Sequence, residues 1–313
     1  MDKLLCLVGP TGVGKSEIAL RLAVALNGEI VNADSRQVYK YLDIGTAKPS
    51  IQDRNKVKHH LLDVAEPDSV FSLALYRQQA LAAFREIAGR GKLPILVGGS
   101  GQYIWSLLEG WEIPPVAPDE QMRQSLEEEA TTEAGKNSLR QELKRLDPDM
   151  YDRIDLHNMR RVIRALETCR QGMQFSKLRQ KMPSEWEGLV VGLTRPRTEL
   201  YQRVDHRVEK MLLDGLLAET QDLLARYPHK HSVLATIGYK QLTAYIRGTT
   251  TLQQAVQTIK FETHRYIRQQ YTWFKPTDPR IQWFTLGQTT DQNVVEEIIA
   301  LTQQFISESK KEK

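Results

Sequence analysis

Short apolar runs alternate with amphipathic stretches along the first hundred residues of the chain. The run at residues 4–9 ends in glycine and predicts a buried strand. Apolar side chains recur at three- and four-residue intervals over residues 72–88, which predicts an amphipathic helix. Further strands are predicted at 29–34, 60–64 and 94–98, and a further helix begins at Lys15. This alternation predicts an α/β fold, a parallel sheet with helices on both faces.

The pattern changes in the middle of the chain. Residues 111–118 contain three prolines and predict a linker, and residues 119–182 are polar and helical without a strand pattern. The sheet then resumes: strands are predicted at 189–193 and 281–286, and helices at 198–213, 216–226, 236–247, 251–275 and 291–308. We therefore predict an α/β core from residues 1–116 plus 188–313. We predict that residues 117–187 form an all-helical insertion domain.

Composition limits the class of protein. Of the 313 residues, 41% are hydrophobic and 26% are charged, which excludes a disordered or fibrous chain. Two cysteines exclude a disulfide framework. No stretch approaches the roughly 20 apolar residues of a membrane span, and the apolar start is too short for a signal peptide. These observations predict a cytoplasmic protein that does not enter a membrane.

Positive charge is concentrated in one part of the chain. The net charge is +4, yet residues 151–285 carry 22 basic and 13 acidic residues, a net +9. Such a segment can neutralise the phosphates of a nucleic acid. The alternative is a set of solvated helix faces.

A phosphate-binding loop (P-loop) follows the first predicted strand. The run Gly9-Pro10-Thr11-Gly12-Val13-Gly14-Lys15-Ser16 fits G-x-x-x-x-G-K-[ST] in full, between a strand and a helix. Its backbone N–H groups and the helix N-terminus favour phosphate. Lys15 would neutralise the terminal phosphate, and the Ser16 hydroxyl would ligand Mg²⁺. The loop predicts a diphosphate or triphosphate ligand with magnesium without saying which bond breaks.

Two further turns lie at the carboxyl edge of the predicted sheet, where ligands bind in such folds. Asp34 there could ligate a metal through water, accept a proton, or cap a helix with Ser35. The run 98–101, Gly-Gly-Ser-Gly, fits either close approach to a ligand or a tight turn into a helix.

Several sequence blocks together match the pattern of one known family. The most specific is residues 34–39 (DSRQVY) followed by 43–49 (DIGTAKP). The remaining blocks, in the same order as in that family, are GPTGVGKS at 9–16, HHLLD at 59–63, LVGGSGQY at 96–103, RALE at 164–167, GYKQ at 238–241 and QYTWF at 270–274. From about residue 4 to residue 285, the chain thus resembles the tRNA dimethylallyltransferase (tRNA isopentenyltransferase) family.

The resemblance implies a reaction and its partners. Family members move a dimethylallyl group from dimethylallyl diphosphate to the exocyclic amine of the adenosine 3′ of the anticodon in tRNA, and they release diphosphate. Mg²⁺ and the P-loop then stabilise a leaving group, and no nucleotide is hydrolysed. The alternatives are a P-loop kinase acting on a small molecule or nucleoside and a non-catalytic, nucleotide-driven RNA-binding switch. We expect a monomer.

Site residues follow from the resemblance, position by position. Those implied in catalysis are Asp34 as the base, with Lys15 and Arg207. Donor contacts are implied at Gly9, Pro10, Thr11, Gly12, Val13, Gly14, Lys15, Ser16 and Ser100, with Ser16 at the metal. Contacts to tRNA are implied at Asp34, Ser35, Arg36, Gln37, Ser100, Arg123, Arg160, Arg161, Val162, Ile163 and Arg164. A basic stripe of Lys260, His264, Arg268 and Lys275 departs from the usual family pattern at His264.

Overall fold

The computed structural model describes residues 2–111, 113, 119–177, 184–228, 232–287 and 291–308. The chain forms two compact units: a core unit, Met1–Leu108 with Ser184–Lys313, and an insertion unit, Glu109–Pro183. The sequence placed the insertion at 117–187, but residues 186 and 187 belong to a strand of the core sheet. Most of the linker predicted at 111–118 lies outside the described residues.

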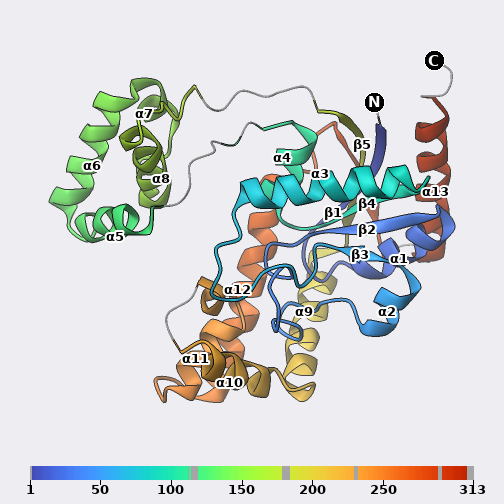
Figure 1. Ribbon diagram of the computed structural model, residues 1–313. Coiled ribbons are helices and arrows are strands. Elements are labelled where there is room, and N and C mark those ends of the chain that lie inside the picture. The colour runs from blue at the N-terminus through green and yellow to red at the C-terminus, as the bar shows by residue number, and fades with distance from the viewer. Residues whose placement is uncertain are drawn as a thin grey trace. The chain divides into compact units, whose positions relative to one another are not determined.

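Six parallel strands form the sheet of the core unit, in the order β3-β2-β4-β1-β5-β6 (Figure 1). The strands are β1 Asp2–Val8, β2 Gly28–Ala33, β3 His59–His60, β4 Leu93–Gly98, β5 Trp186–Thr194 and β6 Ile281–Thr285. β1 lies between β4 and β5, so that Leu5 pairs with Ile95 on one side and Leu189 on the other. The parallel sheet predicted from the sequence is therefore confirmed.

The strand predicted at 60–64 is wrong in extent. β3 contains two residues only, and Leu61 and Asp63 beyond it have φ angles of 62° and 57°. Residues in this left-handed region cannot continue a strand. The apolar pair in HLLDV reflects burial of Leu61 in a turn.

Helices cover both faces of the sheet. On one face lie α1 Lys15–Ala25 and α13 Asp291–Glu308, and on the other lie α3 Leu73–Gly89 and α4 Gly101–Leu108 (Figure 1). The N-terminus of α3 is fixed by Ser72, whose Oγ accepts the N–H of Leu75 at 3.1 Å. A short helix that the sequence pattern did not predict, α2 Ile51–Lys56, is capped in the same way by Ser50.

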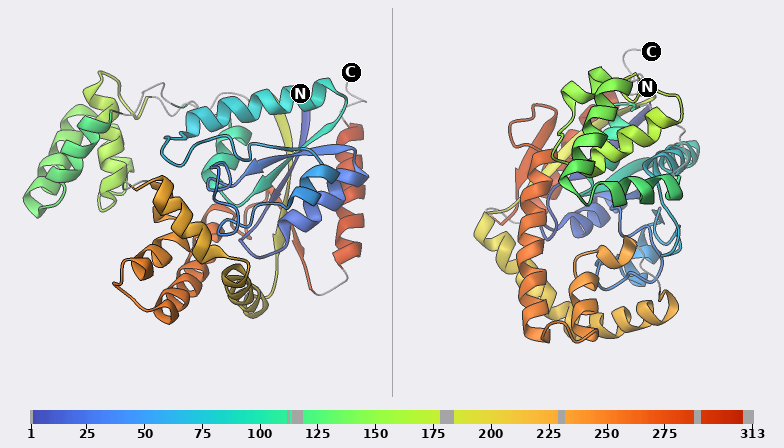
Figure 2. Two further views of the ribbon diagram at one scale, coloured as in Figure 1. Left: turned by 60° about the horizontal axis from the view of Figure 1, so that its bottom comes forward. Right: turned by 90° about the vertical axis from the view of Figure 1, so that its left-hand side faces the viewer.

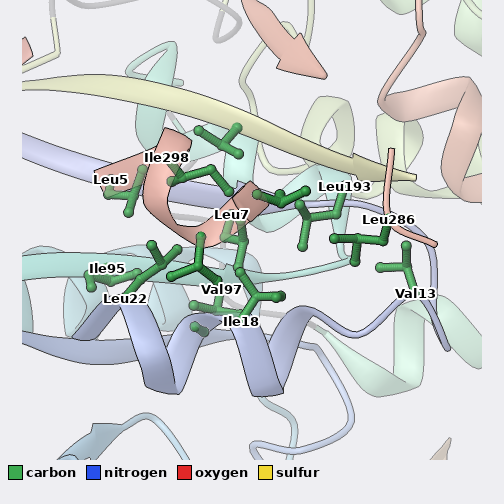
Figure 3. Packing of buried hydrophobic residues seen from close by; sticks show 14 of the residues in the cluster. Leu5, Leu7, Val13, Ile18, Leu22, Ile95, Val97, Leu193, Leu286 and Ile298 are labelled. Carbon is green, nitrogen blue, oxygen red and sulfur yellow. The ribbon is translucent and has the colours of Figure 1, made fainter. Parts of the chain in front are cut away.

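The main hydrophobic core lies between the sheet and the α1–α13 layer (Figure 3). Because side chains alternate along a strand, Leu5 and Leu7 of β1 both face this layer. The core also contains Val13, Ile18, Leu22, Ile95, Val97, Leu193, Leu286 and Ile298. Val13 belongs to the phosphate loop, so this packing also anchors the loop.

A group of helices gathers at one end of the sheet, apart from α1, α3 and α13 (Figure 2). It contains α9 Arg197–Leu213, α10 Leu216–Arg226, the 3-10 turn η1 Ser232–Ala235, α11 Tyr239–Ile246 and α12 Leu252–Trp273. α12 packs against α9, α11 and α4. Segments more than 180 residues from the phosphate loop are thereby brought to it.

The insertion unit has a core of its own. Its helices are α5 Glu120–Glu129, α6 Glu133–Leu146, α7 Pro148–Arg153 and α8 Met159–Arg170. Its buried side chains include Leu126, Leu139, Leu143, Met150, Val162, Ile163 and Leu166. In the described part of the chain, no helix combines the length and the apolar character needed to cross a bilayer.

Candidate active site

The phosphate loop joins β1 to α1 through three glycines with positive φ. Gly9, Gly12 and Gly14 have φ angles of 144°, 80° and 114°. A Cβ atom on Gly9 would lie 2.4 Å from the carbonyl oxygen of Leu193, and one on Gly12 would lie 2.3 Å from Cγ1 of Val204. Glycine is therefore required at Gly9 and Gly12 both by the backbone conformation and by the closeness of β5 and α9.

Lys15, the first residue of α1, turns its ammonium group back across the loop. Its Nζ donates hydrogen bonds to the carbonyl oxygens of Gly9 and Pro10, both at 2.9 Å. Burial lowers the pKa of Lys15 to about 8, while the charge of Asp34 raises it and that of Arg207 lowers it. A bound anion would stabilise the protonated amine, so this environment favours phosphate groups.

Three side chains from distant helices and strand ends hold the loop backbone. Gln270 Oε1 accepts the N–H of Thr11 at 2.8 Å, Arg203 Nε donates to the carbonyl of Gly12 at 3.2 Å, and Arg195 Nε donates to the carbonyl of Val13 at 2.9 Å. Arg195 is buried and pairs with Glu199 and Asp291. Sequence reasoning assigned none of the three to the loop, because contacts over 182 to 259 residues leave no local signal.

Asp34 follows β2 and closes a tight turn. Its Oδ1 accepts the N–H of Arg36 at 2.8 Å, and its own N–H donates to Asn32 Oδ1 at 3.0 Å. One carboxylate oxygen of Asp34 therefore caps the turn, and capping was one of the roles that the sequence left open. The charges of Lys15 and Arg207 also act on this carboxylate. Asp34 is thus held in place and faces two cations.

Ser100 connects the turn after β4 to the turn after β2. Its Oγ accepts the N–H of Ser35 at 3.0 Å, and the hydroxyl of Tyr266 is hydrogen-bonded to it. A Cβ atom on Gly98 would lie 2.1 Å from the carbonyl oxygen of Ala33, so the two strand ends approach closely. Both interpretations of the 98–101 run therefore remain compatible: it is a tight turn, and it borders the site.

A carboxylate from α10 holds the DIGTAKP loop. Glu219 accepts the N–H groups of residues 43–45 at 2.9–3.1 Å. The hydroxyl of Tyr239 donates to the same carboxylate at 2.6 Å, and burial together with this carboxylate raises the pKa of Tyr239. The loop is thereby tied to α10 and α11.

The rest of the motif holds itself together. Gln37, implied at the tRNA surface, donates through Nε2 to the carbonyl oxygens of residues 46–47 at 2.9 and 3.2 Å. Lys48 has a side chain that is 1% exposed, and its Nζ lies 2.7 Å from Asp43 and 2.5 Å from Asp63. The most specific sequence block is thus a network that builds a wall of the site.

Two cavities meet at this wall. The first, about 530 Å³, is lined by basic side chains, namely Lys15, Arg203, His206, Arg207 and Lys210, as well as by Ser16. The second, about 310 Å³, is lined largely by apolar groups, among them Val204, Val208, Met211, Leu216, Ile259 and Tyr266. Thr11, Asp34, Thr46 and Arg207 line both. An anionic group suits the first cavity, a flat apolar group suits the second, and the two would meet at Asp34.

One helix supplies both kinds of lining. Arg203 and Arg207 of α9 lie along the basic cavity, while Val204 and Val208 are buried beside the apolar one. Burial lowers the pKa of Arg207, and the charge of Asp34 opposes this. The basic face and the apolar face of α9 therefore serve the two cavities.

The insertion unit contains an ion triad. Glu167 is 1% exposed and accepts two hydrogen bonds from Arg123, at 2.6 and 3.1 Å, and one from Arg164 at 3.0 Å. Both arginines are half-buried. Glu167 thus fixes the direction of two side chains that the family resemblance assigns to tRNA.

Four neighbouring positions on α8 separate into two groups. Arg160 and Arg161 are exposed. Val162 and Ile163, also implied at the tRNA surface, are 0% and 5% exposed and pack in the core of the insertion unit. Helical periodicity points these two side chains inward, where they support the helix, and the contact of positions 162 and 163 with tRNA stays a prediction.

The basic stripe expected on α12 is largely directed at α9. Lys260 pairs with Glu209 at 2.6 Å, His264 bonds Asp205 at 2.8 Å and stacks on Tyr201, and Arg268 donates to the hydroxyl of Tyr201 at 3.2 Å. These contacts join the two helices. The substitution at His264 therefore belongs to helix packing.

Metal ligands are sparse in the described part of the chain. No group of three or more His, Cys, Asp or Glu side chains there is placed to hold a metal ion. Ser16, in the first turn of α1, is exposed and lines the first cavity. Mg²⁺ commonly takes one or two protein ligands and completes its shell with substrate phosphates and water. This donor set fits a magnesium ion that arrives with a diphosphate.

Comparisons with known proteins agree on one family. Residues 37–277 match the family described as IPP transferase. The chain is 45% identical to a tRNA dimethylallyltransferase of Dehalococcoides mccartyi, over 99% of this chain and 94% of that one, and 46% identical to that of Roseiflexus castenholzii, over 88% and 90%.

Solved structures agree with the sequence matches. The fold is similar to the crystal structure of a tRNA isopentenylpyrophosphate transferase from Bacillus halodurans, with a TM-score of 0.75, 35% identity and 99% of each chain covered. A eukaryotic dimethylallyltransferase acting on tRNA gives a TM-score of 0.84 at 28% identity, covering 98% of this chain and 80% of that one.

Proposed function

The chain belongs to the tRNA dimethylallyltransferase family, and from this premise we propose how its site carries out the transfer. The enzyme moves a dimethylallyl group from dimethylallyl diphosphate to the exocyclic amine of the adenosine 3′ of the anticodon in tRNA. The observation that carries the proposal is the position of Asp34 where a basic cavity meets an apolar one.

The diphosphate of the donor occupies the basic cavity. The P-loop N–H groups and the N-terminus of α1 face its oxygens, and Lys15 and Arg207 neutralise the charge that grows as diphosphate leaves. The dimethylallyl group extends past Thr11 toward the junction. Because the protein does not use phosphoryl transfer, it needs no nucleoside triphosphate.

The adenine enters the apolar cavity. A base must leave its stack before an enzyme can act on it, and apolar walls with a few polar groups suit a flipped base. At the junction the carbon–oxygen bond of the donor breaks and its electron pair goes to diphosphate, while the amine nitrogen bonds to the allylic carbon. The amine proton passes to the carboxylate of Asp34, through the oxygen that is not bonded to Arg36.

A magnesium ion would bind together with the donor. Ser16 would be its protein ligand, and the diphosphate would supply further oxygens. When bound, the ion would help to neutralise the charge of the leaving group.

The tRNA is held by the insertion unit and by the turn after β2. Arg123, Arg160, Arg161 and Arg164 contact the phosphate backbone, and Ser35 and Arg36 line the apolar cavity. We expect the enzyme to act as a monomer in the cytoplasm, where its substrate is found.

One experiment tests the reaction. Unmodified tRNA is incubated with the protein, Mg²⁺ and dimethylallyl diphosphate, with no nucleoside triphosphate present, and the digested tRNA is analysed by mass spectrometry. The adenosine 3′ of the anticodon should gain one dimethylallyl group in the wild type and far less in Asp34→Asn. If no prenylated tRNA forms and added ATP is converted to ADP, the protein would be a kinase instead.

A further inference from the structure

One buried amide joins the two loops that border the donor cavity. Gln270 lies on α12 and is 3% exposed. Its Oε1 accepts the N–H of Thr11 at 2.8 Å, and its Nε2 donates to the carbonyl oxygen of Gly99 at 3.1 Å. A Cβ atom on Gly99 would lie 2.1 Å from this Nε2, so the amide fits tightly against the glycine.

Each bond of the amide acts on a different wall of the site. Thr11 lines both cavities, and its N–H is held by the protein, which fixes the entry of the phosphate loop. Gly99 precedes Ser100, whose Oγ accepts the N–H of Ser35 beside Asp34. A shift of Gln270 would therefore move the phosphate loop relative to the turn that carries the base.

The chemistry of the side chain matters as much as its position. One end must accept a hydrogen bond and the other must donate one, within a tightly packed space. An amide does both at every pH. A carboxylic acid of the same shape does both only while it is protonated, and a thioether does neither.

We propose that Gln270 is a positioning residue for the transfer reaction, setting the distance between the phosphate loop and the turn that carries Ser100. This inference rests on the proposed function, in which the loop holds a diphosphate. It gives the QYTWF block a role at the donor site, although no atom of Gln270 need touch the donor.

Two variants test the proposal. Gln270→Met keeps the bulk and removes both hydrogen bonds. We expect its single-turnover rate with dimethylallyl diphosphate to fall about tenfold to a hundredfold, the usual effect of a small misplacement of reacting groups. Its affinity for inorganic diphosphate with Mg²⁺, measured by calorimetry, should weaken, and its affinity for tRNA should remain unchanged.

Gln270→Glu gives a pH signature. Burial raises the pKa of a carboxyl group, so the neutral acid should restore both bonds at low pH. We expect its rate relative to wild type to be highest at the acidic end of the assay range and to fall as the carboxylate forms. A carboxylate near the diphosphate would also repel it.

Gln254→Glu is the matched control. It lies on the same helix, and its Oε1 also accepts a backbone N–H, that of Thr251 at 3.1 Å. It lies at the exposed N-terminus of α12, and its rate ratio to wild type should not vary with pH.

The outcomes separate the inference from its premise. A Gln270→Met enzyme with the wild-type rate and diphosphate affinity would overturn the positioning role. So would a Gln270→Glu enzyme whose rate ratio is independent of pH. If the wild type itself forms no prenylated tRNA, the proposed function fails, and diphosphate affinity in the same variants still decides the role of Gln270.

Discussion

Replacing Lys15 with methionine should stabilise the protein without its ligands and abolish transfer. Lowering a lysine pKa from 10.5 to about 8 corresponds to roughly 3 kcal/mol of unfavourable free energy when the amine is charged. The carbonyls of Gly9 and Pro10 would lose their partner, which costs about 1–2 kcal/mol. A net gain of about 1–2 kcal/mol remains near neutral pH, equivalent to a few degrees in Tm.

Thermal unfolding in phosphate-free buffer across pH measures this gain. Between pH 8 and 10.5 the unfolded chain binds one proton more than the folded chain at Lys15, so wild-type stability rises with pH in this window. The advantage of Lys15→Met should therefore be largest below pH 8 and should shrink through zero between pH 8 and 10.5. Near pH 10.5 only the loss of the two hydrogen bonds remains, and the variant should be less stable than the wild type by about 1–2 kcal/mol. A variant that is less stable at neutral pH, or a difference that is constant with pH, would refute the reasoning.

Three further predictions concern the base, the tRNA surface and acid stability. Asp34→Asn should lower the single-turnover rate by roughly two to four orders of magnitude at little cost in stability, since Asn caps as well as Asp; a near wild-type rate would exclude Asp34 as the base. Changing Arg160 and Arg161 to Ala should reduce the salt slope of tRNA binding by about 2 and leave donor affinity intact; an unchanged slope would exclude phosphate contacts. Burial favours protonation of Glu29, but hydrogen bonds from His60, Lys92 and Arg90 outweigh it and lower the pKa of Glu29 to about 2. Glu29→Gln should therefore lower the free energy of unfolding by about 3 kcal/mol at neutral pH. Urea titration should show that this difference shrinks as pH falls from 4.5 toward 2.

The sheet and the phosphate loop could be predicted because their signals are local. A strand buried on both faces is an almost continuous apolar run, as at Leu4–Val8, and the P-loop is a contiguous block. Helix α9 could also be predicted from the sequence, because its apolar and its basic residues each recur at helical spacing. Strand β3 was misplaced because burial of Leu61 in a turn gives the same apolar signal as burial in a strand.

The side chains that support the site could not be predicted in the same way. Gln270, Arg195 and Glu219 act through hydrogen bonds to backbone atoms between 171 and 259 residues away. Their own surroundings in the sequence are those of ordinary helix or strand ends. A backbone N–H or carbonyl has no residue identity, so no pairing rule in the sequence points to it. Val162 and Ile163 show the reverse situation, because a family block that is easy to match does not reveal that two of its side chains point inward.

The DIGTAKP block shows how motif specificity and chemistry can separate. Lys48 is buried against two carboxylates, and residues 43–45 surround the carboxylate of Glu219, yet none of these groups takes part in the transfer as proposed. A buried charge is costly unless it is paired, so changing one residue of this network would leave its partners buried without a counter-charge. The block therefore marks the family because it forms a closed polar network. That network shapes the wall from which Thr46 lines both cavities. In the proposed reaction, one carboxylate at the same wall, Asp34, accepts the proton.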